Sequence, residues 1–176
     1  MKELIIFGRS PFINRLNCDA IDYDRFDICC INGSLPQLKR IDYVVSADDF
    51  CKPYIREGAE WISVNNGWKL IKTEARIIQE DAPIRRLSWK HLSSDLAVNF
   101  AIMRGYKTIY LAGIDLVEDG KPFYHWDGVM NKKPQSAEGA KDEKEFIKLL
   151  GRRFGANIYQ LNPDSNWLEV KDLGLL

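Results

Sequence analysis

The sequence predicts an α/β fold, in which a doubly wound, mostly parallel sheet carries helices on both faces within a single domain, residues 1–176. Two observations lead to this prediction. Short apolar runs typical of strands recur along the chain, and helical patterns lie between them. The central run, Thr108–Ala112, is apolar on both faces apart from Thr108 and the hydroxyl of Tyr110, as a parallel strand covered by helices must be.

Strands are expected where β-rich, apolar residues form short runs between turn residues. Two weaker runs, 75–79 and 84–87, are candidates for further short strands. The main expected strands are Lys2–Phe7, Phe26–Ile31, Asp42–Ala47, Glu60–Val64, Thr108–Ala112 and Asn157–Leu161.

Two long helices are expected in the second half of the chain. The first begins near Ser93, where apolar residues recur at helical spacing, and Gly105 suits the left-handed conformation of its end. The second is Ala137–Phe154, which has an apolar face. Ser136 can cap the start of this helix, and Gly155 can stop it.

The overall charge of the chain is balanced. Lys and Arg total 25 and Asp and Glu total 25, so the formal net charge is zero. Nucleic-acid-binding domains are usually basic, so nucleic acid is not an expected partner. No apolar run reaches the ~20 residues of a membrane span, and the N-terminus leads into a strand rather than a signal peptide. The sequence therefore predicts a cytoplasmic protein and leaves its oligomeric state open.

The cysteines indicate free thiols rather than a metal site. The chain has four cysteines and two histidines, but no CxxC pair. Cys29 and Cys30 are adjacent in an expected strand, so their side chains should point to opposite faces of the sheet. We therefore expect buried thiols and no zinc.

Glycine and polar residues follow the expected strands. Gly8, Arg9 and Ser10 come after the first strand, and Asn32 and Gly33 come after the second. Because the carboxyl ends of parallel strands meet at one edge, these turns should lie together where open α/β sheets bind ligands. Each turn alone also fits an ordinary connection, since neither a G-x-G-x-x-G fingerprint nor a Walker lysine is present.

Residues later in the chain should join the same edge. Gly113 and Asp115 follow the central strand, and the first helix begins at Ser93–Ser94, where free backbone N–H groups can bind an anion. A small basic cluster just before this helix could contact the same anion, or it could form a solvated loop: Arg85, Arg86, Lys90 and His91.

Three stretches resemble the bacterial lipooligosaccharide sialyltransferases, and the related 6-hydroxymethylpterin diphosphokinase-like family shares much of the pattern. ELIIFGRSP resembles the strand and turn that wrap the nucleotide in the sialyltransferases. FDICCINGS resembles their strand that ends in a nucleotide-contacting Asn, and GYKTIYLAGID is similar to their Gly-Tyr-Lys-x-Ile-Tyr-Leu-x-Gly-Ile-Asp block. The resemblance implies a Rossmann-like fold and nucleotide binding, and it is weak between residues 50 and 88.

The resemblance also implies a set of nucleotide-binding residues. The residues that follow the first strand would lie along the phosphates and ribose. The residues that follow the second strand would contact the nucleotide or the transferred sugar. The helix serines would bind phosphate or sugar, and the residues after the central strand would line the nucleoside pocket of a CMP- or UDP-type donor. The implied residues all lie at strand ends or at the helix start: Gly8, Arg9, Ser10, Asn32, Gly33, Ser93, Ser94, Gly113, Ile114 and Asp115.

The catalytic base of the sialyltransferases has no direct counterpart. Those enzymes use a histidine in the loop before the last long helix, and residues 131–136 contain none. His125 and Asp127 are the nearest candidates, because histidine titrates near neutral pH and a carboxylate can orient it. Between Tyr124 and Trp126, His125 also fits a surface position or a sugar-stacking platform.

The sequence is compatible with three functions. The first is a glycosyltransferase-like protein that binds a nucleotide or nucleotide sugar, with His125 or Asp127 accepting the proton of the acceptor. The second is a non-catalytic nucleotide-binding or interaction protein of the same fold. The third is a Mg²⁺-dependent diphosphokinase, in which Asp48 and Asp49 would hold the metal. No metal site is assigned in the first two.

Overall fold

The fold is built on a parallel sheet. The computed structural model describes residues 2–46, 53–63, 93–116, 123–124, 127, 130–131 and 136–176. Within them, six strands form one sheet in the order β4-β3-β2-β1-β5-β8, and β6 pairs with β7 in a separate antiparallel ribbon. The strands are β1 Glu3–Phe7, β2 Phe26–Ile31, β3 Tyr43–Ser46, β4 Glu60–Ser63, β5 Thr108–Ala112, β6 Phe123–Tyr124, β7 Met130–Asn131 and β8 Asn157–Gln160.

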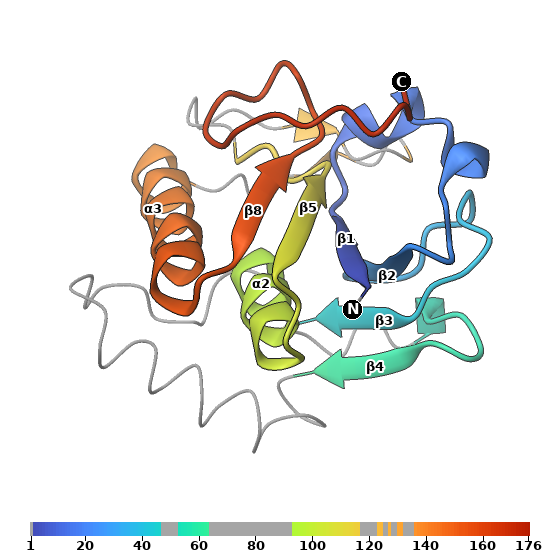
Figure 1. Cartoon of the computed structure of the whole chain (residues 1–176). Helices are drawn as coiled ribbons and strands as arrows, with labels where there is room; N and C mark the ends of the chain where they lie inside the picture. Colours follow the sequence, from blue (N-terminus) through green and yellow to red (C-terminus); the bar gives the residue numbers. More distant parts are fainter. Residues whose placement is uncertain are drawn as a thin grey trace.

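The sheet reverses its winding direction between β1 and β5. Strands β2, β3 and β4 extend from one side of β1, and β5 and β8 extend from the other (Figure 1). All five pairings in this sheet are parallel. The α/β fold with a doubly wound parallel sheet is thus confirmed. Open α/β sheets bind ligands in a crevice at such a reversal, and the corresponding edge here, at the carboxyl ends of β1 and β5, is called the β1–β5 crevice.

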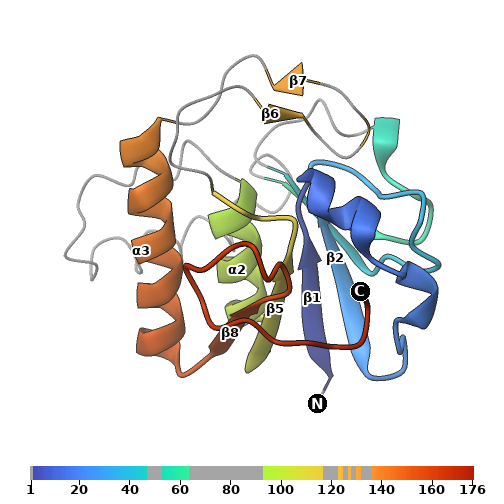
Figure 2. The ribbon, with the colours of Figure 1, turned by 90° about the horizontal axis from the view of Figure 1, so that it is seen from above.

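Helical elements cover both faces of the sheet, but not equally. The two α-helices, α2 (Ser93–Met103) and α3 (Ala137–Phe154), lie on one face, and the 3₁₀ helices η1 (Pro11–Arg15) and η2 (Cys18–Ala20) lie on the other (Figure 2). The C-terminal segment completes this second layer, because the N–H of Asn17 donates to the carbonyl of a buried Leu175 at 2.7 Å.

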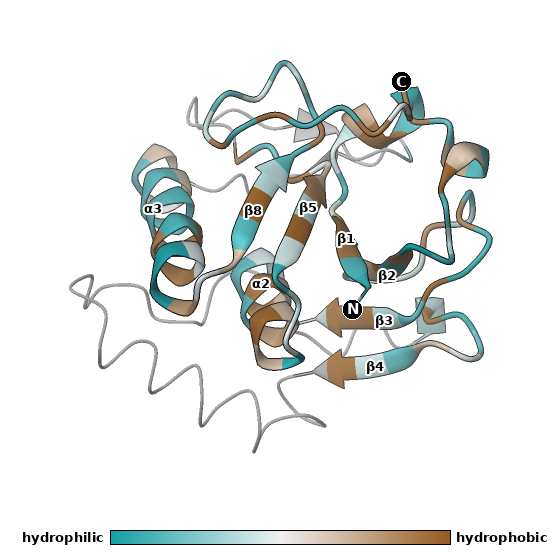
Figure 3. Cartoon of the chain, in the orientation of Figure 1, coloured by the Kyte–Doolittle hydropathy of each residue, from teal (hydrophilic) through white to brown (hydrophobic). Residues whose placement is uncertain are grey.

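The strands separate two apolar cores. Successive side chains of β1 alternate, so that Ile6 packs with α2 and α3 while Phe7 packs with η1. Cys29 and Cys30 divide in the same way, as expected from their adjacent positions, and both are fully buried free thiols. Figure 3 shows the apolar strands at the centre and polar residues along the outer side of α3.

The ends of α3 follow the predicted capping residues. The Ser136 hydroxyl accepts a hydrogen bond from the N–H of Gly139 at 3.0 Å, and Gly155 ends the helix in the left-handed conformation with φ 62°. The helix α2 ends at Met103, and Gly105 turns the chain into β5 with φ 87°. Both helices therefore occur where the sequence predicts them.

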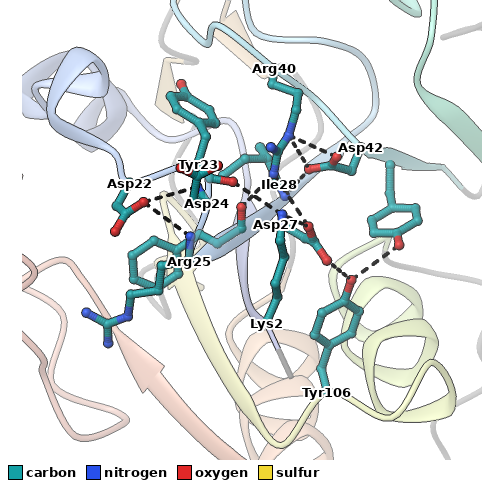
Figure 4. Close-up of polar contacts among 12 residues, drawn as sticks. Lys2, Asp22, Tyr23, Asp24, Arg25, Asp27, Ile28, Arg40, Asp42 and Tyr106 are labelled. Carbon is teal, nitrogen blue, oxygen red and sulfur yellow. Dashed lines mark hydrogen bonds and ion pairs between the residues drawn. The ribbon is translucent and has the colours of Figure 1, made fainter.

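A polar network fastens the amino ends of the strands, opposite the crevice (Figure 4). Asp27 on β2 accepts a hydrogen bond from the Tyr106 hydroxyl at 2.5 Å, and Arg40 and Lys2 lie 3.4 and 3.3 Å from its other oxygen. The hydroxyl oxygens of Tyr106 and Tyr43 also lie within hydrogen-bond distance, at 3.2 Å. Burial and these hydrogen bonds raise the pKa of Tyr106.

Some sequence predictions lie outside the described residues, including the candidate strands at 75–79 and 84–87, the Asp48–Asp49 pair and the basic cluster before α2. Among the helices that are described, none combines the length and the apolar character that a membrane span requires. The described residues also contain no group of three or more His, Cys, Asp or Glu side chains that could hold a metal ion.

Candidate functional site

The loops after β1 and β5 pack directly on each other at the crevice. Phe7 pairs in register with Ala112, and both strands end there. The N–H of Gly8 donates to the carbonyl of Ala112 at 2.7 Å, and the N–H of Ser10 donates to the carbonyl of Gly113 at 3.1 Å. Gly113 itself has φ 67°, a conformation that favours glycine. The backbone thus joins two predicted parts of the site that are far apart in sequence.

Side chains strengthen the same junction. The Ser10 hydroxyl donates to Oδ2 of Asp115 and accepts a hydrogen bond from the N–H of Phe12 at 3.1 Å, which caps η1. Asn162, which follows β8, donates from Nδ2 to Oδ1 of Asp115 at 2.8 Å. Because the single hydroxyl proton of Ser10 points to Asp115, this side chain holds the loop and is not free to donate to a ligand.

Two residues after or within β8 were not among the predicted site residues. They are Asn162 and Gln160. The side chain of Gln160 is fully buried, and its Nε2 donates to the carbonyl of Ile114 at 2.8 Å. Together they orient the loop that carries Ile114 and Asp115. In the sequence Gln160 is a polar residue near the end of an expected strand, but nothing there shows which loop it would contact.

The end of β2 meets the start of α2. The Ser93 hydroxyl donates to Oδ1 of Asn32 at 2.7 Å, although the two residues are 61 positions apart. Asn32 has φ 58° and Gly33 has φ 122°, so both residues of the predicted turn lie in the left-handed region that Asn and Gly tolerate best. The predicted contact region of Asn32, Gly33 and Ser93 is therefore assembled in space.

The next residues of α2 face a different neighbour. The Ser94 hydroxyl donates to the carboxylate of Glu143, which is fully buried on α3. Asp95 is also buried, and its Oδ1 has no hydrogen-bond partner among the described residues. Burial raises the pKa of Asp95 to about 7. Ser94 thus ties the helix start to α3, while Ser93 faces the strand ends.

Arg9 supplies the positive charge at this edge. Its Nη1 donates to the carbonyl of Asn32 at 3.2 Å, and its Nη2 lies 2.8 Å from Oδ2 of Asp127. Asp127 was predicted as a catalytic residue together with His125, and His125 lies outside the described residues. The ribbon of β6 and β7, on either side of Asp127 in the sequence, lies beyond the carboxyl ends of the sheet (Figure 2).

Solved structures share this architecture. The sialyltransferase CstII from Campylobacter jejuni, in complex with CMP-3FNeuAc, superposes with a TM-score of 0.62 at 14% identity, covering 98% of this chain and 87% of that one. The monofunctional α-2,3-sialyltransferase Cst-I from the same organism gives 0.67 at 18% identity, covering 98% and 81%. This chain has the same fold as these solved structures. An apo α-2,3-sialyltransferase of Campylobacter jejuni gives 0.63 at 21% identity, covering 98% and 80%.

The sialyltransferase fold is what these comparisons establish, because the sequence identities are low. No protein-family model matches the sequence, and no curated protein matches it either. The solved structures give no support to the diphosphokinase-like part of the resemblance. Among the residues that the structure describes, the β1–β5 crevice brings together the guanidinium of Arg9, the carboxylate of Asp115 and the polar start of α2.

Proposed function

We propose that this protein binds a nucleotide or nucleotide sugar at the carboxyl edge of its sheet and acts as a glycosyltransferase. The observation that carries the proposal is the packed β1–β5 junction, which brings Arg9, Asn32 and Asp115 to one crevice. Solved structures of the same fold include CstII with cytidine-5′-monophosphate and a sialyltransferase with a trisaccharide acceptor and CMP. Ligands of open α/β sheets bind at this place.

The proposed roles follow the position of each group in the crevice. The loop after β5 would face the nucleoside, because Asp115 is held rigidly there by Ser10 and Asn162. The guanidinium of Arg9 would face the phosphate, since arginine matches the geometry of phosphate oxygens. The turn after β2 would contact the sugar. The remaining proposed binding residues are Gly8, Gly33, Ser93, Gly113 and Ile114. The hydroxyls of Ser10 and Ser94 donate to carboxylates of the protein and are not assigned to the ligand.

The proposed reaction is a direct displacement. The oxygen of an acceptor hydroxyl attacks the anomeric carbon, and the bond from that carbon to the phosphate oxygen breaks. The nucleotide leaves with the bonding electrons, and the hydroxyl proton passes to a base, for which His125 and Asp127 are the candidates. A positive side chain beside the phosphate, here Arg9, stabilises the charge that develops on the leaving group.

Calorimetry with CMP, UDP, a CMP-sugar and a UDP-sugar tests the binding step. We expect one of the two nucleotide classes to bind, and at a hundred times its Kd to add about 2.7 kcal/mol to the free energy of unfolding. Ser93→Ala should weaken this binding, because Asn32 loses its hydrogen bond. Thr108→Val, which removes a hydroxyl at the opposite end of β5, is the control. Absence of heat with all four ligands would sink the proposal.

Release of free nucleotide from the sugar donor, in the presence of acceptor sugars, tests the transfer step. With His125→Ala we expect a loss of about 10²-fold or more in turnover, with donor affinity within twofold, if His125 is the base. Wild-type protein that binds a donor tightly but releases no nucleotide with any acceptor would favour the non-catalytic binding protein instead.

A further inference from the structure

The guanidinium of Arg9 is only partly satisfied. Nη1 donates to the carbonyl of Asn32 at 3.2 Å, and Nη2 donates to Oδ2 of Asp127 at 2.8 Å. The Nε atom is buried and has no hydrogen-bond partner among the described residues. Buried donors are nearly always paired in folded proteins, so an unpaired one beside a candidate ligand site indicates an acceptor supplied from outside.

The free donor and the ion-paired donor belong to the same planar group. Arginine binds carboxylate and phosphate oxygens best through two parallel N–H donors, which adds both strength and geometric selectivity. Asp127 accepts a hydrogen bond from Nη2 of Arg9. The carboxylate therefore occupies part of the guanidinium edge without completing it, and it leaves Nε of Arg9 for another oxygen.

The Arg9–Asp127 pair is also accessible. Each side chain retains 27% of its exposure, so water and ions reach the pair. Partly exposed ion pairs contribute little net stability because their charges remain hydrated. A phosphate group, which carries more charge and more acceptor oxygens than one carboxylate, can displace Asp127 from Arg9 at small cost.

We propose that Asp127 is an exchangeable counter-ion of Arg9, which a phosphoryl group of the ligand must displace in order to bind. This inference rests on the proposed function and concerns how tightly the same site binds a phosphoryl group. Asp127 holds the guanidinium in place while the site is empty. Because an anion must displace it, Asp127 weakens the binding of a phosphate and leaves the binding of a neutral nucleoside unaffected.

A double-mutant cycle on Arg9 and Asp127 tests the proposal, with CMP, cytidine and inorganic pyrophosphate as calorimetric probes. We expect Asp127→Asn to tighten CMP and pyrophosphate about tenfold and to leave cytidine unchanged, because only the phosphates compete with the carboxylate. Arg9→Gln should weaken CMP and pyrophosphate. In the Arg9→Gln background, Asp127→Asn should tighten CMP and pyrophosphate by much less than the tenfold expected in the wild-type background.

A matched control comes from the opposite end of the sheet. Glu60 pairs with Arg104 there, so Glu60→Gln removes one carboxylate from an arginine without touching the crevice, and it should leave all three affinities unchanged. The inference is overturned if Asp127→Asn weakens phosphate binding or leaves it unaltered. It is also overturned if the variant raises the affinity for cytidine as much as the affinity for CMP. Pyrophosphate binding that tightens in Asp127→Asn, without any CMP binding, upholds the inference and rejects the proposed nucleotide site.

Discussion

A β-carbon on Gly8 would lie 2.3 Å from the carbonyl oxygen of Gly113. It would also lie 2.7 Å from Cγ1 of Ile114. Atoms at such distances cannot coexist, so the glycine allows the loop after β1 to reach the loop after β5. The glycine that the sequence associates with nucleotide contact therefore has a structural task of its own, and substitution by a large residue would disturb the fold before it revealed anything about a ligand.

Gly8→Ala should lower the free energy of unfolding by about 3 kcal/mol, because the two loops must separate to admit the methyl group. Chemical denaturation measures this change. Gly58→Ala is the matched control: Gly58 has φ 89° but nothing within 4 Å of a β-carbon, so only the backbone strain remains, about 1 kcal/mol. Equal losses in the two variants would mean that the loops tolerate the methyl group.

Ser10→Ala should cost more stability than an ordinary cap. Ser10 caps η1 and also donates to Asp115, so its loss leaves a half-buried carboxylate without one partner, and about 2 kcal/mol is expected. Ser136→Ala removes a cap from α3 with no carboxylate attached, and it should cost about 1 kcal/mol. Thermal unfolding compares the two variants, and an equal cost would show that the bond to Asp115 contributes nothing.

Tyr106→Phe tests the network at the amino ends of the strands. The variant removes the hydroxyl that donates to Asp27 and contacts Tyr43, and it should destabilise the protein by about 1–3 kcal/mol. Tyr54→Phe, at a side chain that is 66% exposed, should change the stability by less than about 0.5 kcal/mol. Nucleotide binding by Tyr106→Phe should remain normal, because the network lies at the opposite edge of the sheet.

Asp95 makes the stability depend on pH. Its pKa is about 7 in the folded protein against an ordinary value of 3.8, because burial disfavours the charged form. Between these values the folded state retains a proton that the unfolded state has lost, so the free energy of unfolding falls as the pH rises, and the full penalty is present above about pH 7. Asp95→Asn does not titrate and removes this penalty.

Denaturation of wild type and Asp95→Asn at pH 4 and pH 8 measures the effect. The advantage of the variant should grow by on the order of 2–4 kcal/mol between the two pH values. Glu138→Gln is the control, because Glu138 occupies the first turn of α3 as Asp95 does that of α2, but is exposed. A pH-independent difference for Asp95→Asn would contradict the raised pKa.

The sequence by itself determined the strands of the main sheet, the two long helices and the edge of the sheet at which a ligand is expected to bind. Apolar runs predicted β2 and β5 to the residue, and the serine and glycine caps did the same for α3. Cys29 and Cys30 were predicted to point to opposite faces of the sheet, and they lie in different apolar clusters. These features are local: hydrophobic period, capping and turn chemistry act over a few residues, so a single sequence contains them.

Only the tertiary structure decided which polar groups meet. Ser10 and Asp115 are 105 positions apart, and Arg9 and Asp127 are 118 apart. Such contacts depend on the order of the strands and on the close approach of the loops after β1 and β5 at Gly8. Neither feature can be read from the residues near each position in the sequence. For the same reason, Asn162 and Gln160 could not be assigned to the site from their own surroundings. The hydroxyls of Ser10 and Ser94, expected to face phosphate, donate to carboxylates because the packing of the loops and of α3 brings those acceptors within reach.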